Sequence, residues 1–176
     1  MADWIIERLA GHHDRTHFDC GKPSLSEWIK KYAGQNEARD VSRTFVAVLS
    51  DTSRVFGYYC LSNSQITNDA LPIKDGKGLS RNQPVPTALI GRLAVDRNSQ
   101  GKKLGEFLLL DALARTERLS KEMGVVAVVV DALDEQAKAF YLKYGFEELL
   151  DDPLHLFITL KVVRKLGLNS PRTLPR

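Results

Sequence analysis

The chain has 176 residues, of which 43% are hydrophobic and 27% are charged, and its formal net charge is +3. This length suits one domain with a substantial core and is short for two. No apolar run approaches the roughly 20 residues that a membrane helix needs, and the first 30 residues lack the order of a signal peptide. We therefore expect a cytoplasmic protein that does not bind a membrane.

The chain has two cysteines and three closely spaced histidines near its N-terminus, and we expect none of them to hold a metal. Cys20 and Cys60 show no CxxC spacing, which predicts free thiols in a reducing compartment. His12, His13 and His17 lack flanking carboxylates at ligand spacing. The sequence thus predicts no metal site.

The charges are unevenly distributed along the chain. Basic residues outnumber acidic ones over residues 51–105, whereas acidic residues predominate over residues 106–160. Such asymmetry favours an anionic ligand at one face. The alternative is a solvated surface on which the charges average out.

The first part of the chain predicts a strand, a helix and a hairpin. Residues 4–9 have the composition of a short strand. Ser24, followed three residues later by Glu27, has the pattern of a capping box before residues that recur at helical spacing. Residues 43–49 and 55–61 are β-rich runs separated by polar residues, which predicts a hairpin.

A long loop and a strand–helix pair are predicted next. Residues 68–87 hold three prolines and two glycines, which favours a loop that is functional or mobile. Residues 87–95 have the composition of a central strand. A helix is expected from about Lys103 to Met123, with Gly124 as its C′ residue.

The last predicted elements are a buried strand, a helix and two strands. Residues 125–130 form a run rich in β-branched side chains, typical of a strand buried on both faces. Asp134 is placed to cap a helix that ends at Gly145. Residues 146–150 and 156–160 complete the set.

This order of elements predicts an α/β (α+β) fold in which one mixed sheet has helices packed against it. We expect a single domain over residues 1–166 and a flexible basic tail over residues 167–176.

The segment with the clearest chemistry is the turn of residues 100–105. It reads Gln100, Gly101, Lys102, Lys103, Leu104, Gly105. Small residues and two lysines lead directly into a helix, whose first N–H groups point outward and bind anions. The turn therefore predicts a cradle for a pyrophosphate. The alternative is that the two lysines are surface charges at a helix start.

The second informative segment, residues 137–146, places Tyr141 on the helix that stops at Gly145, before an apolar residue, Phe146. One helix and one strand separate it from the turn. A phosphate cradle and a phenol at that separation suggest a coenzyme at one end and a proton donor at its reactive end. The alternative is a core aromatic, which is the reading we favour for Tyr144.

These two motifs, in this order, resemble the GNAT superfamily of N-acetyltransferases over about residues 4–162. In that family the motif [RQ]-x-x-G-x-[GA] binds the pyrophosphate of acetyl-coenzyme A through backbone N–H groups. Gln100 and Gly105 match the ends of the motif, while Lys103 replaces its middle glycine. The resemblance implies the GNAT fold: a single mixed, mostly antiparallel sheet of six to seven strands flanked by helices, with acetyl-CoA in the cleft between the fourth and fifth strands.

The resemblance also implies roles for individual residues. Tyr141 takes the place of the family's general acid, and the strand before the turn would pair with the amides of pantetheine. The implied coenzyme contacts are Leu93, Ala94, Val95, Gln100, Gly101, Lys102, Lys103, Leu104, Gly105, Glu106, Asp134, Ala137 and Phe140. For Asp134 the capping role comes first and the coenzyme contact second.

A narrower resemblance is to the GNAT toxins of type II toxin–antitoxin modules. It rests on residues 18–21, the early helix, and residues 43–46, 57–62 and 90–95. It implies acetyl transfer to the α-amino group of aminoacyl-tRNA, which stops translation. It also implies a ribbon-helix-helix antitoxin, contact with operator DNA only through the antitoxin complex, and a homodimer.

The expected chemistry needs little from the enzyme's side chains. An α-amino group has a pKa of about 7.7–8.0, so part of it is neutral at physiological pH. The chain offers no obvious base beside either motif, which fits an α-amine better than a lysine. A phenol, with a pKa near 10, stays protonated, and Tyr141 could give its proton to the thiolate that leaves.

Five basic residues are candidates for contacts with the tRNA backbone: Lys22, Lys30, Lys31, Arg81 and Arg92. Each alone is more often a solvated side chain. Two other functions stay open at this point. One is a GNAT enzyme that acts on a small amine or a protein N-terminus, and the other is an interaction protein that keeps the fold without turnover.

Overall fold

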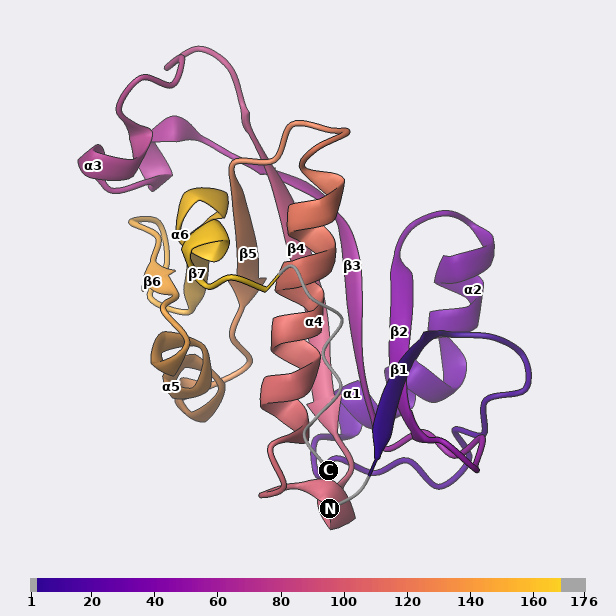
Figure 1. Cartoon of the computed structure of the whole chain (residues 1–176). Coiled ribbons are helices and arrows are strands. Elements are labelled where there is room, and N and C mark those ends of the chain that lie inside the picture. Colours follow the sequence, from indigo (N-terminus) through magenta and orange to yellow (C-terminus); the bar gives the residue numbers. More distant parts are fainter. Residues whose placement is uncertain (1–2, 169–176) are drawn as a thin grey trace. The chain divides into compact units, whose positions relative to one another are not determined.

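The computed structural model describes residues 3–168, and Figure 1 traces the chain. Its strands are β1 (Trp4–Arg8), β2 (Arg43–Leu49), β3 (Gly57–Ile66), β4 (Val85–Val95), β5 (Ala127–Asp131), β6 (Glu147–Glu148) and β7 (His155–Thr159). Its α-helices are α1 (Pro23–Lys31), α2 (Ala33–Ala38), α3 (Ile73–Gly76), α4 (Leu104–Leu119), α5 (Glu135–Lys143) and α6 (Leu160–Lys165), with 3-10 turns η1 (Asn68–Ala70) and η2 (Arg97–Ser99).

The strands form one seven-stranded sheet in the order β1-β2-β3-β4-β5-β7-β6. Strand β4 pairs with β5 in parallel, while the pairs β1–β2, β2–β3, β5–β7 and β6–β7 are antiparallel. The predicted mixed, mostly antiparallel sheet flanked by helices is therefore confirmed. Within residues 3–168 no helix combines the length and apolarity needed to cross a membrane.

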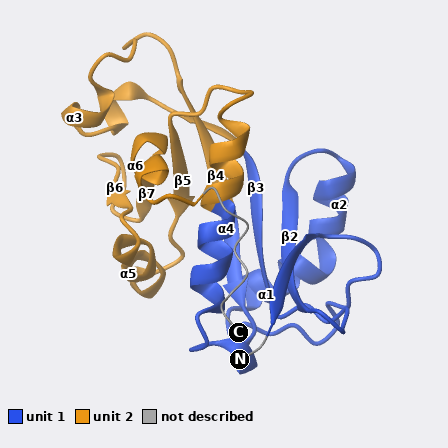
Figure 2. Cartoon of the chain, viewed as in Figure 1, with its two compact units in different colours: residues 1–62, 91–112, 170–176 blue, residues 63–90, 113–169 orange. Residues whose placement is uncertain are grey.

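The chain divides into two compact units, coloured separately in Figure 2. Residues 1–62 and 91–112 belong to unit 1, and residues 63–90 and 113–169 to unit 2. In unit 1 the helix α1 buries Trp28 and Ile29 among residues of β2 and β3, together with Ala94 at the end of β4. In unit 2 a second core gathers around Phe157 and Val129.

The predicted start of the first helix is wrong. Helix α1 begins at Pro23, its N-cap is Lys22, and no side chain caps it. Proline is favoured at the first helical position because its fixed φ suits the helix and its missing N–H needs no partner. Glu27 does not close a capping box either, because it forms an ion pair with Lys31 one turn later.

Other boundaries differ from the prediction as well. Helix α4 ends at Leu119 instead of Met123, and Gly124 is not among the residues with positive φ, so it is not a left-handed cap. The long loop contains η1 and α3 and gives way to β4 at Val85. Helices α2 and α6 were not predicted. Of the expected tail, Leu168 is buried, and residues 169–176 lie outside the described residues.

Candidate functional site

Strand β4 extends beyond its parallel partner. Its eleven residues run from Val85 to Val95, whereas its ladder with β5 covers Thr87–Ile90. Residues 91–95 continue past that ladder, and backbone polar groups that leave a ladder need another partner. Leu93, Ala94 and Val95, the residues predicted to pair with pantetheine, all lie in this extension.

The turn after β4 is held by side chains that bond to the backbone. Asp96 is almost fully buried, and its two carboxylate oxygens accept the N–H groups of Asp19 and Asn98, each at 3.1 Å. The Gln100 amide donates to the carbonyls of Cys20 and Val95, at 3.1 and 3.0 Å. Gln100 therefore braces the turn, and its amide N–H groups are already engaged within the protein.

The segment of residues 100–105, called the phosphate loop below, has the backbone of an anion cradle. Gly101 has φ +76° and Lys103 has φ +64°, both in the left-handed region. Lys103 thus adopts a conformation that glycine takes without strain. Leu104 begins α4 and is fully buried, which fixes the loop to the core. The first N–H groups of a helix have no intrahelical acceptor and are available to an anion.

Tyr141 lies on α5, a helix with a defined start and end. Asp134 caps it, accepting the N–H of Ala137 at 2.8 Å, which confirms the predicted N-cap. Tyr141 is 7% exposed, and its ring packs against those of Phe140 and Phe146, with centroids 5.2 and 5.4 Å away.

Two features of α5 bear on its predicted roles. The helix ends close to Gly145, as predicted, and Gly145 has φ +95°, the left-handed conformation that favours glycine after a helix. The pairing of Asp134 with Ala137 means that two of the predicted coenzyme contacts already bond to each other. The Ala137 N–H is therefore engaged.

The predicted residues fall into both units. Residues 93–95, the phosphate loop and Glu106 belong to unit 1, whereas Asp134, Ala137, Phe140 and Tyr141 belong to unit 2. Their roles in binding acetyl-coenzyme A and in catalysis remain predictions.

Four of the five candidate tRNA contacts come together at α1. Lys22 is its N-cap, Lys30 and Lys31 lie in its last turn, and the Arg92 guanidinium lies over the ring of Trp28. Lys31 is paired with Glu27, which raises the pKa of the lysine and lowers that of the glutamate through their hydrogen bond. Arg81 lies in unit 2, before β4.

Both cysteines are free, as predicted, and the structure buries both of them. Burial raises the pKa of the Cys60 thiol, although the Arg92 guanidinium opposes that shift. Burial likewise raises the pKa of Tyr58, whose hydroxyl donates to the carbonyl of Leu25 at 2.7 Å. The Cys60 thiol and the Tyr58 hydroxyl therefore stay uncharged at neutral pH.

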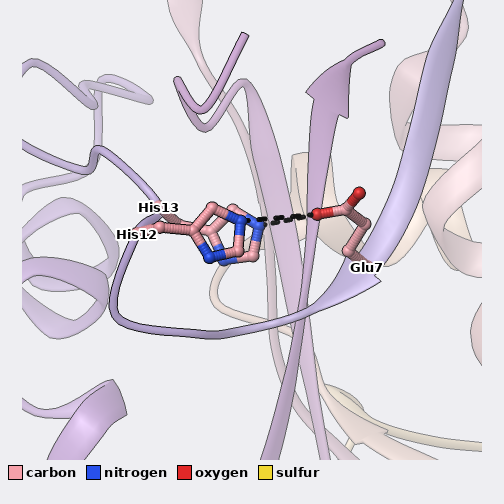
Figure 3. Close-up of side chains that lie close together, drawn as sticks. All are labelled: Glu7, His12 and His13. Carbon is pink, nitrogen blue, oxygen red and sulfur yellow. Dashed lines mark hydrogen bonds and ion pairs between the residues drawn. The ribbon is translucent and has the colours of Figure 1, made fainter. Parts of the chain in front are cut away.

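The structure brings together a cluster that the sequence did not reveal: Glu7, His12 and His13 (Figure 3), whose possible ligand atoms lie within 4.8 Å of one another. The sequence shows no carboxylate at ligand spacing beside these histidines, but the turn after β1 returns His12 and His13 to Glu7. His17 is not part of the cluster.

The hydrogen bonds of His13 decide what this cluster can do. The Ala10 N–H donates to its Nδ1 at 2.9 Å, so the proton of the neutral ring is on Nε2, which lies 2.9 Å from Glu7. A metal at Nε2 would displace that proton, and Nδ1 could take it only by losing the bond from Ala10. The geometry favours a structural hydrogen bond over a metal site.

The comparisons with known proteins agree with this geometry. A family model described as "Acetyltransferase (GNAT) domain" matches residues 41–148. A tRNA-acetylating toxin of Mycobacterium tuberculosis (strain ATCC 25618 / H37Rv) is 37% identical over 159 residues, covering 90% of this chain and 93% of the relative. The probable toxin TacT of Sinorhizobium fredii (strain NBRC 101917 / NGR234) is 30% identical and covers 92% and 94%. The chain belongs to the GNAT acetyltransferase family.

Solved structures give the same picture. A tyrosine-to-phenylalanine mutant of KacT superposes with a TM-score of 0.89 at 33% identity, covering 93% of this chain and 99% of that one. AtaT complexed with acetyl-methionyl-tRNAfMet gives 0.88 at 28% identity, covering 94% and 99%. An AtaT mutant bound to acetyl-CoA and to the C-terminus of the antitoxin AtaR gives 0.80 at 26%, covering 94% and 98%. The AtaT–AtaR complex bound to DNA gives 0.75 at 28%, covering 93% and 99%.

Proposed function

We propose that this protein is the toxin of a toxin–antitoxin pair, and that it transfers the acetyl group of acetyl-coenzyme A to the α-amino group of aminoacyl-tRNA, which blocks translation. The observation that carries the proposal is the phosphate loop, in which Lys103 keeps a left-handed backbone at the start of α4. The likeness to a tRNA-acetylating toxin over 90% of the chain supports the choice of acceptor.

The proposed reaction assigns a role to each part of the site. The N–H groups of the phosphate loop hold the pyrophosphate of the coenzyme, and the extension of β4 pairs with pantetheine. The neutral α-amine attacks the thioester carbon, and a backbone N–H of residues 93–95 stabilises the oxygen that becomes negative. The ammonium proton passes to water, the C–S bond breaks, and Tyr141 protonates the thiolate and then regains its proton from water.

The test is transfer of radiolabelled acetyl from acetyl-coenzyme A to a pool of aminoacylated tRNA. We expect label at the aminoacyl end with the wild type. Release of coenzyme A with small amines or peptides, without label on tRNA, would instead favour an N-acetyltransferase of small acceptors. No turnover with any amine would contradict an enzymatic function.

The basic residues can be tested through salt. If the candidate contacts neutralise about five phosphates, the slope of log affinity against log salt should be about −3 to −5. Phosphate contacts release counterions, so binding of tRNA through them must weaken as salt rises. An affinity that does not change with salt would contradict tRNA as the substrate.

We further propose a ribbon-helix-helix antitoxin, operator DNA contacts made only through the toxin–antitoxin complex, a homodimeric toxin, and action in the cytoplasm where tRNA is charged. The structures of AtaT with AtaR, and of that complex with DNA, support the antitoxin and its link to DNA. Light scattering of the purified toxin, with and without its antitoxin, tests the stoichiometry.

A further inference from the structure

Three side chains of unit 1 form a layered stack at α1. The rings of Tyr58 and Trp28 lie nearly parallel, with centroids 5.7 Å apart and an interplanar angle of 16°. The guanidinium carbon of Arg92 lies 4.6 Å from the centre of the Trp28 ring. Trp28 is 5% exposed and the Tyr58 hydroxyl bonds to α1. Arg92 therefore rests on a rigid aromatic base.

Several arginines of unit 1 are paired with a carboxylate, and within the described residues Arg92 is not one of them. Arg8, Arg43 and Arg97 each form an ion pair with a carboxylate. No such pair involves Arg92 anywhere in residues 3–168, although its side chain is partly buried. A partly desolvated guanidinium without a counter-ion is costly, and its planar set of donors fits a phosphate well.

The backbone places this cation on a defined side of β4. Residues two apart on a strand share a face, so Arg92 lies on the same face as Ala94, which packs in the core that includes Trp28. Leu93 and Val95 alternate with them. The guanidinium is therefore on the α1 side of the strand extension that we assign to pantetheine.

We propose that Arg92 binds the phosphodiester that joins the last two nucleotides of aminoacyl-tRNA. This inference rests on the proposed function and deepens it. In such a substrate the α-amine is carried on the ribose of the terminal nucleotide, so the first anion along the chain is that phosphate. Small amines and peptide N-termini have no equivalent group. Arg92 then favours an acceptor that carries its amino acid on a nucleotide over a simple amine, and it positions the α-amine of that acceptor.

The test compares acceptors that differ by one phosphate. Acetylation of an aminoacyl-adenosine, which has no phosphate, is measured beside an aminoacylated cytidylyl-adenosine dinucleotide and full aminoacyl-tRNA. The variants are Arg92→Ala, Arg92→Lys and the control Arg54→Ala. Arg54 is a matched choice because it also lies over an aromatic ring, that of Phe56, at 5.2 Å.

We expect Arg92→Ala to lower kcat/KM about 10- to 100-fold for the two acceptors with a phosphate, the loss of one charge-assisted hydrogen-bonded contact. The aminoacyl-adenosine should be acetylated as by the wild type. Arg92→Lys keeps the charge but lacks the planar guanidinium, so its kcat/KM for these two acceptors should lie between those of the wild type and Arg92→Ala. Arg54→Ala should not change the ratio between acceptors.

The outcomes separate this inference from the proposed function. An equal loss on all three acceptors, or no loss on any, would overturn the role of Arg92 and leave acetylation of aminoacyl-tRNA standing. If the wild type acetylates none of the three, the proposed function falls and the inference falls with it. Thermal unfolding of each variant shows whether it is folded. If Arg92→Ala is unfolded, the ratio between acceptors for Arg92→Lys decides.

Discussion

The phosphate loop and helix α5 offer chemistry of different kinds. The loop offers backbone N–H groups at the start of α4, which substitutions other than proline leave in place. Helix α5 offers one side-chain hydroxyl, that of Tyr141, on a ring packed between Phe140 and Phe146. Because Lys103 keeps a left-handed backbone, we expect the loop to bind the coenzyme through its shape even with a lysine in place of a glycine. If Tyr141 is the general acid, as we propose, helix α5 should be sensitive to the loss of that one hydroxyl oxygen.

The largest effect is expected for the variant Tyr141→Phe. The aromatic ring stays and fills its buried position, so the fold and the KM for acetyl-coenzyme A should not change. Loss of the general acid should lower kcat about 10²- to 10⁴-fold. The matched control is Tyr144→Phe, one turn away on the same segment, which should keep the wild-type rate. Equal rates for wild type and Tyr141→Phe in a single-turnover assay would contradict the assignment.

The packing beneath the phosphate loop can be perturbed at Gly57 on β3, which lies close to Ala94 and Leu104. A Cβ at this position would lie 2.9 Å from Leu108, and 3.2 Å from both the Ala94 carbonyl oxygen and Leu104. Gly57→Ala should therefore cost about 1–3 kcal/mol of unfolding free energy by overpacking. It should also raise the KM for acetyl-coenzyme A, because Ala94 and Leu104 hold the coenzyme strand and the loop.

Urea unfolding and steady-state kinetics measure the two effects of Gly57→Ala. Gly11→Ala is the control, since a Cβ there meets nothing within 4 Å. A destabilised Gly57→Ala with an unchanged KM would separate the core contact from the coenzyme site.

A smaller effect is expected at the start of α5. Asp134→Ala removes the side chain that accepts the Ala137 N–H at 2.8 Å, and loss of such a cap costs about 1 kcal/mol. If Asp134 acts only as a cap, the KM for acetyl-coenzyme A should change little. Asp134→Asn keeps the cap and is the matched control. A large KM change in both variants would show a direct coenzyme contact.

Much of the sheet could be predicted because its strands are local patterns of β-branched and aromatic residues. Predictions from such patterns were wrong where two local preferences of the sequence opposed each other. The β-branched Val162 and Val163 do not suggest a helix, yet Thr159 caps α6 by accepting the Val162 N–H at 3.3 Å. At α1, the preference of proline for the first turn outweighed the Ser24 pattern.

The site was predictable only in part, for a related reason. Short motifs identify the phosphate loop and Tyr141 because neighbouring residues form them. The contacts of Arg92 with Trp28 and of His13 with Glu7 depend on chain segments that meet only after folding. These contacts therefore cannot be predicted from the spacing of residues along the sequence.

The smallest effect tests the backbone of the loop at Lys103. A non-glycine residue at φ +64° is strained by about 1 kcal/mol, and glycine relieves most of this at some entropic cost in the unfolded chain. Lys103→Gly should be about 0.5–1 kcal/mol more stable to urea than Lys103→Ala. Both lose the same charge, so both should raise the KM for acetyl-coenzyme A equally at low salt, with the difference from wild type fading as salt screens it. Equal stabilities would contradict the left-handed conformation, and unequal KM values would show that the side chain acts on the shape of the loop and not through its charge.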